Sequence, residues 1–224
     1  MSDAKGVNIP RLIAVPSLIT LVVTILRVMG ELKHWPTPLV STAAGGGMAI
    51  LGISWLPIIF GPYFALKLAG SGEAPSSYGR AIGYAIGGLV VFILGALLFG
   101  YGFSHQSKVA LLGALLMLVS AFVPPMGWRS LGRALLGYAL AARIPVMVVM
   151  YFAMTGNGGA GWGTHYDAVP PQMVNVSLTT KYIMLGVIPQ MTVWIGFTSI
   201  VGSIFGGIVA SIAKKEKRPT TAAA

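Results

Sequence analysis

The sequence predicts an all-α integral membrane protein with about six transmembrane helices and a long loop between the fifth and sixth. Of the 224 residues, 55% are hydrophobic and only 9% are charged, whereas soluble domains average about 25% charged residues. Apolar runs of membrane-spanning length recur along the whole chain. Residues 1–224 are therefore predicted to form a single transmembrane domain in the lipid bilayer.

Six apolar runs define the predicted helices, in the order 12–29, 39–69, 81–103, 109–126, 131–154 and 182–213. Each approaches or exceeds the length of about 20 apolar residues that crosses the hydrocarbon core. No small-residue cleavage site follows the first run, so we expect a retained helix rather than a signal peptide. The long connection, residues 155–180, is rich in glycine and carries Trp162, a residue type suited to the membrane interface.

The distribution of lysine and arginine predicts the orientation. Ten of these cations lie at the end of the spans that holds both termini: Lys5, Arg11, Lys67, Arg80, Arg129, Arg133, Lys214, Lys215, Lys217 and Arg218. Four lie at the other end: Arg27, Lys33, Lys108 and Lys181. Because cytoplasmic loops carry the excess of positive charge, both termini and the basic tail 214–224 are expected in the cytoplasm, with the protein in the cytoplasmic membrane and its long loop facing outward.

The formal net charge of +10 is thus spread over short loops and the tail. There it serves as an orientation signal and lies near anionic headgroups. No basic stripe with interleaved aromatic residues is present, and nucleic acid is not an expected partner.

Arg143 is the charged residue that most needs an explanation. It lies between the small and apolar residues 134–142 and the apolar run 144–154, near the middle of the predicted fifth span. A guanidinium at that depth costs at least about 2.5 to 3.5 kcal/mol unless it is satisfied. All five acids lie in loops or at the ends of spans, so no carboxylate of this chain is expected beside it: Asp3, Glu31, Glu73, Asp167 and Glu216.

Three interpretations of Arg143 remain open at this point. It is a structural arginine that caps backbone carbonyls freed by prolines such as Pro145, or it binds an anionic solute or lipid headgroup, or it meets an acid of a partner subunit. At 100° per residue, Arg129 and Arg133 fall on the same face of the helix as Arg143, which predicts one cationic stripe.

A short internal match accompanies this arginine. Residues 56–66 in the second run align without gaps with residues 144–154 in the fifth, sharing proline, tyrosine, phenylalanine and alanine. Spans three apart run in opposite directions, so the match is consistent with a 3+3 inverted repeat over about 10–105 and 106–213, whose interrupted helices would surround a central binding site. The candidate ligand-binding set is Arg143, Pro57, Pro145, Pro189 and Gln190.

Two series of glycines are typical of close helix packing. Gly79, Gly83 and Gly87 recur at helical spacing in the third run, and Gly202 and Gly206 do so in the sixth. Small residues at this spacing let helix backbones approach closely, either within one subunit or between subunits. They predict a homo-oligomer or contacts with partner membrane subunits.

A metal site at the outer face is a third line of expectation. His34, His105 and His165 all lie at the predicted outer ends of spans, and Asp167 follows closely after His165. Three imidazoles and a carboxylate can complete a tetrahedral zinc site. No two of the histidines have a local ligand spacing, so ordinary interface or loop histidines are the competing interpretation.

No catalytic motif is present, and the chain has no cysteine, so neither an enzyme nor a cofactor is predicted. The leading hypothesis is a small transporter or channel-like protein that handles an anionic solute or a lipid headgroup. The alternative hypothesis is a noncatalytic structural or assembly subunit of a larger membrane complex.

Overall fold

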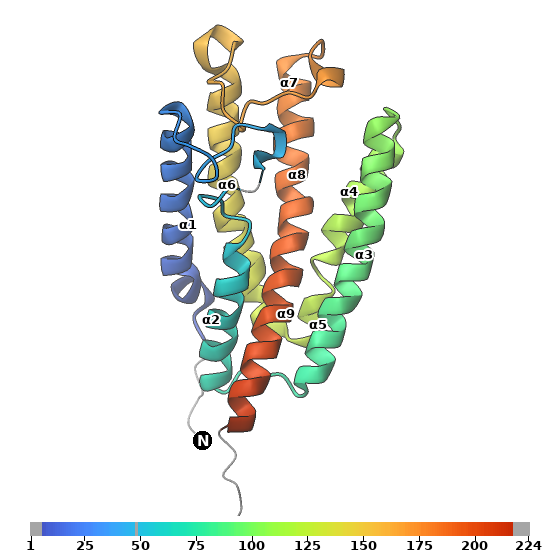
Figure 1. Ribbon diagram of the computed structural model, residues 1–224. Helices are drawn as coiled ribbons and strands as arrows, with labels where there is room; N and C mark the ends of the chain where they lie inside the picture. The colour runs from blue at the N-terminus through green and yellow to red at the C-terminus, as the bar shows by residue number, and fades with distance from the viewer. Residues whose placement is uncertain (1–5, 48, 217–224) are drawn as a thin grey trace, which may run out of the picture.

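The computed structural model describes residues 6–47 and 49–216, and within them it is all-helical, without a strand (Figure 1). The long helical segments are α1 (Ile9–Leu32), α2 (Leu56–Gly70), α3 (Tyr78–Ser104), α4 (Val109–Ser120), α6 (Arg129–Gly159) and α9 (Val193–Glu216). The short ones are η1 (Ala44–Gly46), α5 (Pro124–Gly127), η2 (Pro171–Met173), α7 (Leu178–Lys181), η3 (Tyr182–Val187) and α8 (Ile188–Met191).

The helices lie side by side in one bundle (Figure 1). The start of α1, the connection from α2 to α3 and the end of α9 lie at one end, which we call the basal end. The connections after α1, α3 and α6 lie at the opposite end, the loop end. This arrangement brings the segment that follows α1 close to the long loop that follows α6.

Five helical stretches of the described chain are long and apolar enough to cross a membrane: Ile9–Leu32, Tyr78–Ser104, Val109–Gly127, Arg129–Gly159 and Leu178–Lys214. An all-helical fold with such stretches is compatible with a helical membrane protein. Their outward surfaces are apolar, and side chains such as Leu97 of α3 are among the most exposed in the chain. Exposed leucines along a helix are expected where lipid replaces water as the solvent.

Polar side chains fix where three helices begin. The N-cap oxygens of Asn8, Ser77 and Ser177 accept hydrogen bonds from the backbone N–H groups of Arg11, Arg80 and Thr180 at 3.0, 3.3 and 3.2 Å. Each bond satisfies one of the N–H groups that has no partner within the helix. The prediction of helices near these positions is confirmed.

The predicted second helix is wrong over its first half. Residues 39–47 and 49–55 are not α-helical, and α2 begins only at Leu56, with Pro57 in its first turn. Glycine explains this difference, because Gly45, Gly46 and Gly47 all adopt positive φ angles that L side chains rarely adopt. At 1.5 Å per residue, the 15 residues of α2 span only about 22 Å, less than the hydrocarbon thickness of about 30 Å.

The last run forms one helical column with an irregular middle. The π-helical turn η3 lies just before Pro189, whose missing N–H removes a bond from the regular ladder. Thr192, with φ −112° and ψ −67°, then separates α8 from α9. We expected Pro189 and Gln190 to divide this run. The structure instead shows a local change in helical winding there, and the column continues.

The core lies at the basal half of the bundle, between α1, α2, α6 and α9. Phe60 and Phe64 of α2 meet Tyr138 of α6 edge-on, at ring-centroid distances of 5.4 and 5.6 Å. The Tyr138 hydroxyl and the Thr20 hydroxyl of α1 share a hydrogen bond of 2.8 Å. This buried cluster fixes α6 against its neighbours, and α6 carries Arg143.

The two glycine series have different surroundings. Gly202 and Gly206 of α9 pack on Gly61 of α2, so closely that a Cβ atom on Gly61 would overlap the backbone of Gly202. Added Cβ atoms would meet no atom of another helix within 4 Å at Gly79 and Gly83 of α3. The glycines of α9 thus form a contact within the chain. Partner contacts through the glycines of α3 remain a prediction.

The segments that match in sequence take different places in the fold. Pro57 lies at the start of α2, whereas Pro145 lies inside α6. The inverted repeat remains a prediction. Of the expected basic tail 214–224, residues 217–224 lie outside the described residues.

Candidate functional site

Arg143 is buried in the middle of α6, with only 4% of its surface exposed. It follows Arg129 by 14 residues, which corresponds to about 21 Å along the helix axis. Arg129 and Arg133 of the same helix are exposed. The expected cationic stripe is therefore divided, because two of its arginines are exposed and Arg143 is buried.

The side chain of Arg143 has one close polarisable partner. Its Cζ atom lies 4.6 Å from the centroid of the Trp194 ring in α9, a cation–π contact. Its Nε atom is buried without a hydrogen-bond partner. Within the part of the chain that the structure describes, no ion pair involves Arg143, and no carbonyl accepts a hydrogen bond from it. The interpretation as a carbonyl cap therefore lacks its defining bonds.

Arg143 lines a cavity of about 310 Å³ between α6, α8, α9 and the segments at the loop end. The polar and aromatic side chains that line it are Arg27, Arg143, His165, Tyr166, Gln190 and Trp194. Gln190 also has an unsatisfied atom, its buried Oε1, while its Nε2 atom contacts only the Met150 sulfur, at 3.8 Å. Two polar groups that lack ordinary partners thus border one space.

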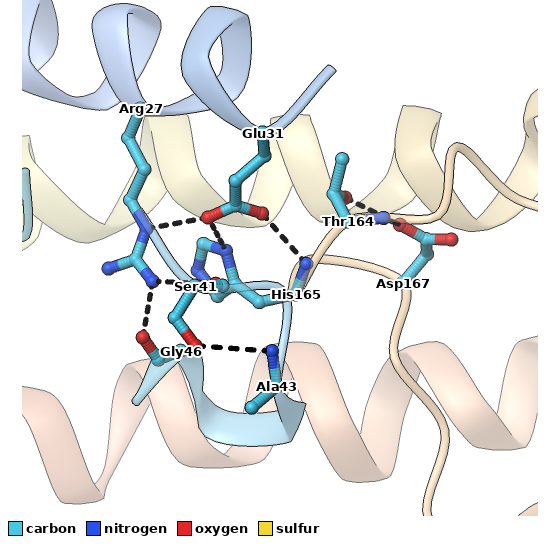
Figure 2. Close-up of polar contacts among 8 residues, drawn as sticks. All are labelled: Arg27, Glu31, Ser41, Ala43, Gly46, Thr164, His165 and Asp167. Atoms are coloured by element: carbon cyan, nitrogen blue, oxygen red, sulfur yellow. Dashed lines mark hydrogen bonds and ion pairs between the residues drawn. The ribbon is translucent and has the colours of Figure 1, made fainter. Parts of the chain in front are cut away.

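A second arginine at the same cavity has three hydrogen-bond acceptors, as Figure 2 shows. Arg27, in the last turns of α1, donates from Nε to Glu31 Oε1 at 2.8 Å. Its Nη2 atom donates to the carbonyl oxygens of Gly46 at 2.5 Å and Ser41 at 3.3 Å. Arg27 therefore ties the segment around η1 to α1.

Glu31 also holds the long loop that follows α6 (Figure 2). Its Oε2 atom accepts the backbone N–H of His165 at 2.8 Å, and its Oε1 atom lies 2.6 Å from His165 Nδ1. Only 1% of Glu31 is exposed. We call Arg27, Glu31 and His165 the loop-end network; it joins α1 to two segments that cover the cavity.

Burial lowers the pKa of His165 below its usual 6.5, and the nearby charge of Arg27 lowers it further, against the opposing effect of Glu31. The imidazole is therefore neutral at pH 7, and its Nδ1–H donates to the ionised carboxylate of Glu31. Burial also raises the pKa of the neighbouring Tyr166, which keeps its hydroxyl neutral.

The charges around the cavity do not balance. Glu31 compensates Arg27, and neutral His165 adds nothing. Arg143 has no compensating carboxylate among the described residues. The cavity therefore carries one uncompensated positive charge, at the group whose Nε has no partner.

The structure brings together part of the predicted ligand-binding set. Arg143, Pro189 and Gln190 all line the cavity. Pro57 and Pro145 are not among its lining residues: the first lies in the first turn of α2, and the second is half-buried within α6. Prolines at matching positions of the two aligned segments thus do not shape one common site.

The predicted metal site does not assemble. His34 and His105 are exposed at the ends of different helices, and His105 Nδ1 contacts the Tyr101 carbonyl at 2.8 Å. His165 binds Glu31, and Asp167 accepts the backbone N–H groups of Gly163 and Thr164 at 2.9 and 2.8 Å. No group of three or more metal-ligating residues forms among the described residues, because His165 and Asp167 bind other groups and the two remaining histidines lie at separate helix ends.

Sequence reasoning missed the loop-end network. It placed Glu31 with the loop acids and counted Arg27 among the loop cations, although the two are buried in α1. Their i, i+4 spacing was a signal for a helical ion pair. The part played by His165 and Trp194 depends on tertiary contacts, for which the sequence carries no local pattern.

No protein-family model, no curated protein and no solved structure matches the chain. The chemistry of the cavity is therefore the basis for inferring its function.

Proposed function

We propose that this chain is a multi-pass membrane protein that binds and passes an anionic group, as a small transporter or channel-like protein does. The anionic group is a small solute or a lipid headgroup, and Arg143 is its principal binding residue. One observation carries the proposal: a buried guanidinium without an ion pair among the described residues borders a cavity.

The free-energy cost of burying the charge of Arg143 favours a functional role over a purely structural one. A charged side chain at membrane depth is expensive, and such residues typically pair with one another or mark a solute pathway. The face of Trp194 offsets only part of that penalty, since a desolvated cation–π contact is worth about 2 kcal/mol. An anion in the cavity supplies the missing counter-charge.

The proposed topology places six spans in the cytoplasmic membrane, with α2 as a short span and the basal end in the cytoplasm. Lys67, Arg80, Arg129 and Arg133 belong to the basal half, which the positive-inside rule assigns to the cytoplasm. The network and the loops over the cavity then face outward, so the anion enters from the outer side.

The irregular segments near the cavity support a pathway rather than a sealed core. Apart from the short helix η1, residues 33–47 and 49–55 are not helical, and the π-helical turn η3 lies shortly before Gln190. Such backbone is tolerated at membrane depth only where it is buried in protein or lines a cavity. Ala44, Gly45 and Gly47 do line the cavity.

An anion-flux assay tests this proposal. Purified protein in liposomes is expected to release a loaded monovalent anion, and Arg143→Gln is expected to abolish release. Arg133→Gln is the matched control, because it removes an exposed arginine from the same helix. Equal flux through wild type and Arg143→Gln, with both folded, would remove the basis of the proposal.

The alternative function is a noncatalytic subunit of a membrane complex, and the open stripe at Gly79 and Gly83 favours it. Close approach of a partner helix is the usual use of such small residues. Mass spectrometry after mild-detergent purification distinguishes the subunit function from the transporter-like one. A membrane protein that copurifies with wild type but not with Gly83→Leu supports the subunit function. If no membrane protein copurifies, the subunit function is contradicted.

A further inference from the structure

A second cavity adjoins the one that holds Arg143. Its volume is about 360 Å³, and it lies at the loop end between the turn from α3 to α4 and the segment of η2 and α7. Its walls are mainly apolar, and they include Phe103, Leu111, Met173, Val176 and Met184. Both cavities fall at the lower end of the range of about 300–1,000 Å³ that is usual for ligand sites.

Two side chains are common to both cavities. Phe103 of α3 and Met184 of η3 line the apolar cavity as well as the Arg143 cavity. Phe103 also stacks on Phe99, which lines the Arg143 cavity, with ring centroids 5.9 Å apart. The two spaces are therefore neighbours whose walls share one aromatic ring and one flexible thioether side chain.

The Arg143 cavity is poorly suited to a free, strongly hydrated anion. Besides Arg143, it offers the amide of Gln190, the hydroxyl groups of Ser54 and Tyr166 and the indole N–H of Trp194, and side chains such as Val146 and Phe99 form much of its wall. An anion that leaves water loses hydration that these few donors replace only in part. A ligand that also buries hydrocarbon gains the free energy that this loss requires.

We infer that the ligand is a monoanionic amphiphile, a single-chain molecule with one negative charge at one end. Its headgroup binds Arg143, and its hydrocarbon chain passes Phe103 and Met184 into the apolar cavity. This inference rests on the proposed function and names its substrate class. One charge is specified because Glu31 already compensates Arg27, which leaves Arg143 as the group to be neutralised.

A series of alkyl sulfonates tests the inference, because their single charge does not change with pH. Methane-, butane- and octanesulfonate are titrated calorimetrically into the protein in nanodiscs, with empty nanodiscs subtracted and octan-1-ol as the uncharged control. Wild type is expected to bind the longer chains more tightly, by about fourfold for each methylene that becomes buried. Octan-1-ol is expected to bind far more weakly than octanesulfonate.

Two variants test where the hydrocarbon chain of the ligand binds, and a third tests where its charged headgroup binds. Val176→Trp fills part of the apolar cavity without lining the Arg143 cavity, and it is expected to weaken octanesulfonate binding by roughly tenfold or more while leaving methanesulfonate unaffected. Val174→Trp is the matched control, since the nearby Val174 is exposed and lines neither cavity. Arg143→Gln is expected to abolish binding of every sulfonate, and its thermal unfolding transition verifies that it is folded.

The outcomes separate this inference from the proposed function. Binding that depends on Arg143 but is equal for all chain lengths overturns the amphiphile and leaves the anion site intact. Chain-length dependence that survives Arg143→Gln overturns it as well, because hydrocarbon partitioning alone then explains the binding. If no sulfonate binds to folded wild type, the anion site itself is contradicted.

Discussion

The guanidinium of Arg143 lies over the indole ring of Trp194, with Cζ 4.6 Å from the ring centroid. The contact joins the middle of α6 to the first turn of α9, and both residues line the cavity. Trp194 thus both stabilises the charge and orients it. The first prediction concerns this pair.

Replacing Trp194 with leucine is expected to destabilise the empty protein by about 2 kcal/mol, because a desolvated cation loses its π partner. Trp194→Phe is expected to lose less, since a smaller aromatic face remains. Thermal unfolding in detergent measures both variants. In an Arg143→Leu background the two substitutions should differ much less, and an unchanged difference there would show that the ring contributes through packing alone.

Removing the charge of Arg143 is expected to stabilise the protein in the absence of ligand. Arg143→Leu eliminates a buried cation without a counter-charge among the described residues, which favours the folded state by about 1–3 kcal/mol. A rise in the thermal midpoint together with loss of anion binding is the expected result. A marked fall in the midpoint would mean that bonds to Arg143 stabilise the fold.

Breaking the loop-end network from its acidic side is expected to have the opposite effect. Glu31→Gln leaves Arg27 buried without its carboxylate, which typically costs about 3–5 kcal/mol. The double variant Arg27→Met, Glu31→Leu buries no charge and is expected to recover much of the lost stability. Thermal unfolding of the two proteins side by side measures this, and equal instability would point to the loop bonds as the main contribution.

Acid is expected to weaken the network through His165, whose pKa burial lowers below 6.5. Below pH 6.5 the unfolded chain binds a proton at this residue that the folded protein does not, so stability is present at higher pH and is lost as the pH falls toward the folded pKa. The thermal midpoint from pH 8 to pH 5 records this loss. His165→Asn should flatten the profile relative to wild type, whereas His105→Asn, at an exposed histidine, should keep its shape.

A methyl group at Gly46 is expected to disrupt the segment that Arg27 holds. The added Cβ would lie 2.8 Å from Arg27 Nη2 and 3.0 Å from His165 Cδ2, at a φ of +83°. Gly45→Ala is the matched control, because Gly45 has a similar φ of +78° but no neighbour within 4 Å. Both variants carry backbone strain, so limited proteolysis of the 33–55 segment should be clearly faster for Gly46→Ala; equal rates would exclude the contact as the cause.

Apolar composition predicted the helical class and the approximate position of most helices, because lipid-facing helices need continuous apolar residues. It failed at residues 39–55, where glycines within an apolar run support a loop instead of a helix. Arg143 stood out because a charge within an apolar run is costly wherever it points. Its partner Trp194, and the burial of Glu31, depend on contacts between distant segments that no local pattern encodes.

The loop-end network also sets an order of events during synthesis. Glu31 receives two of its bonds from His165, which follows it by 134 residues. At about 5–20 residues per second, the ribosome needs roughly 7–27 s to make that stretch. During this interval α1 holds a carboxylate that only Arg27 can engage, so the cover of the cavity closes after most of the bundle has been made.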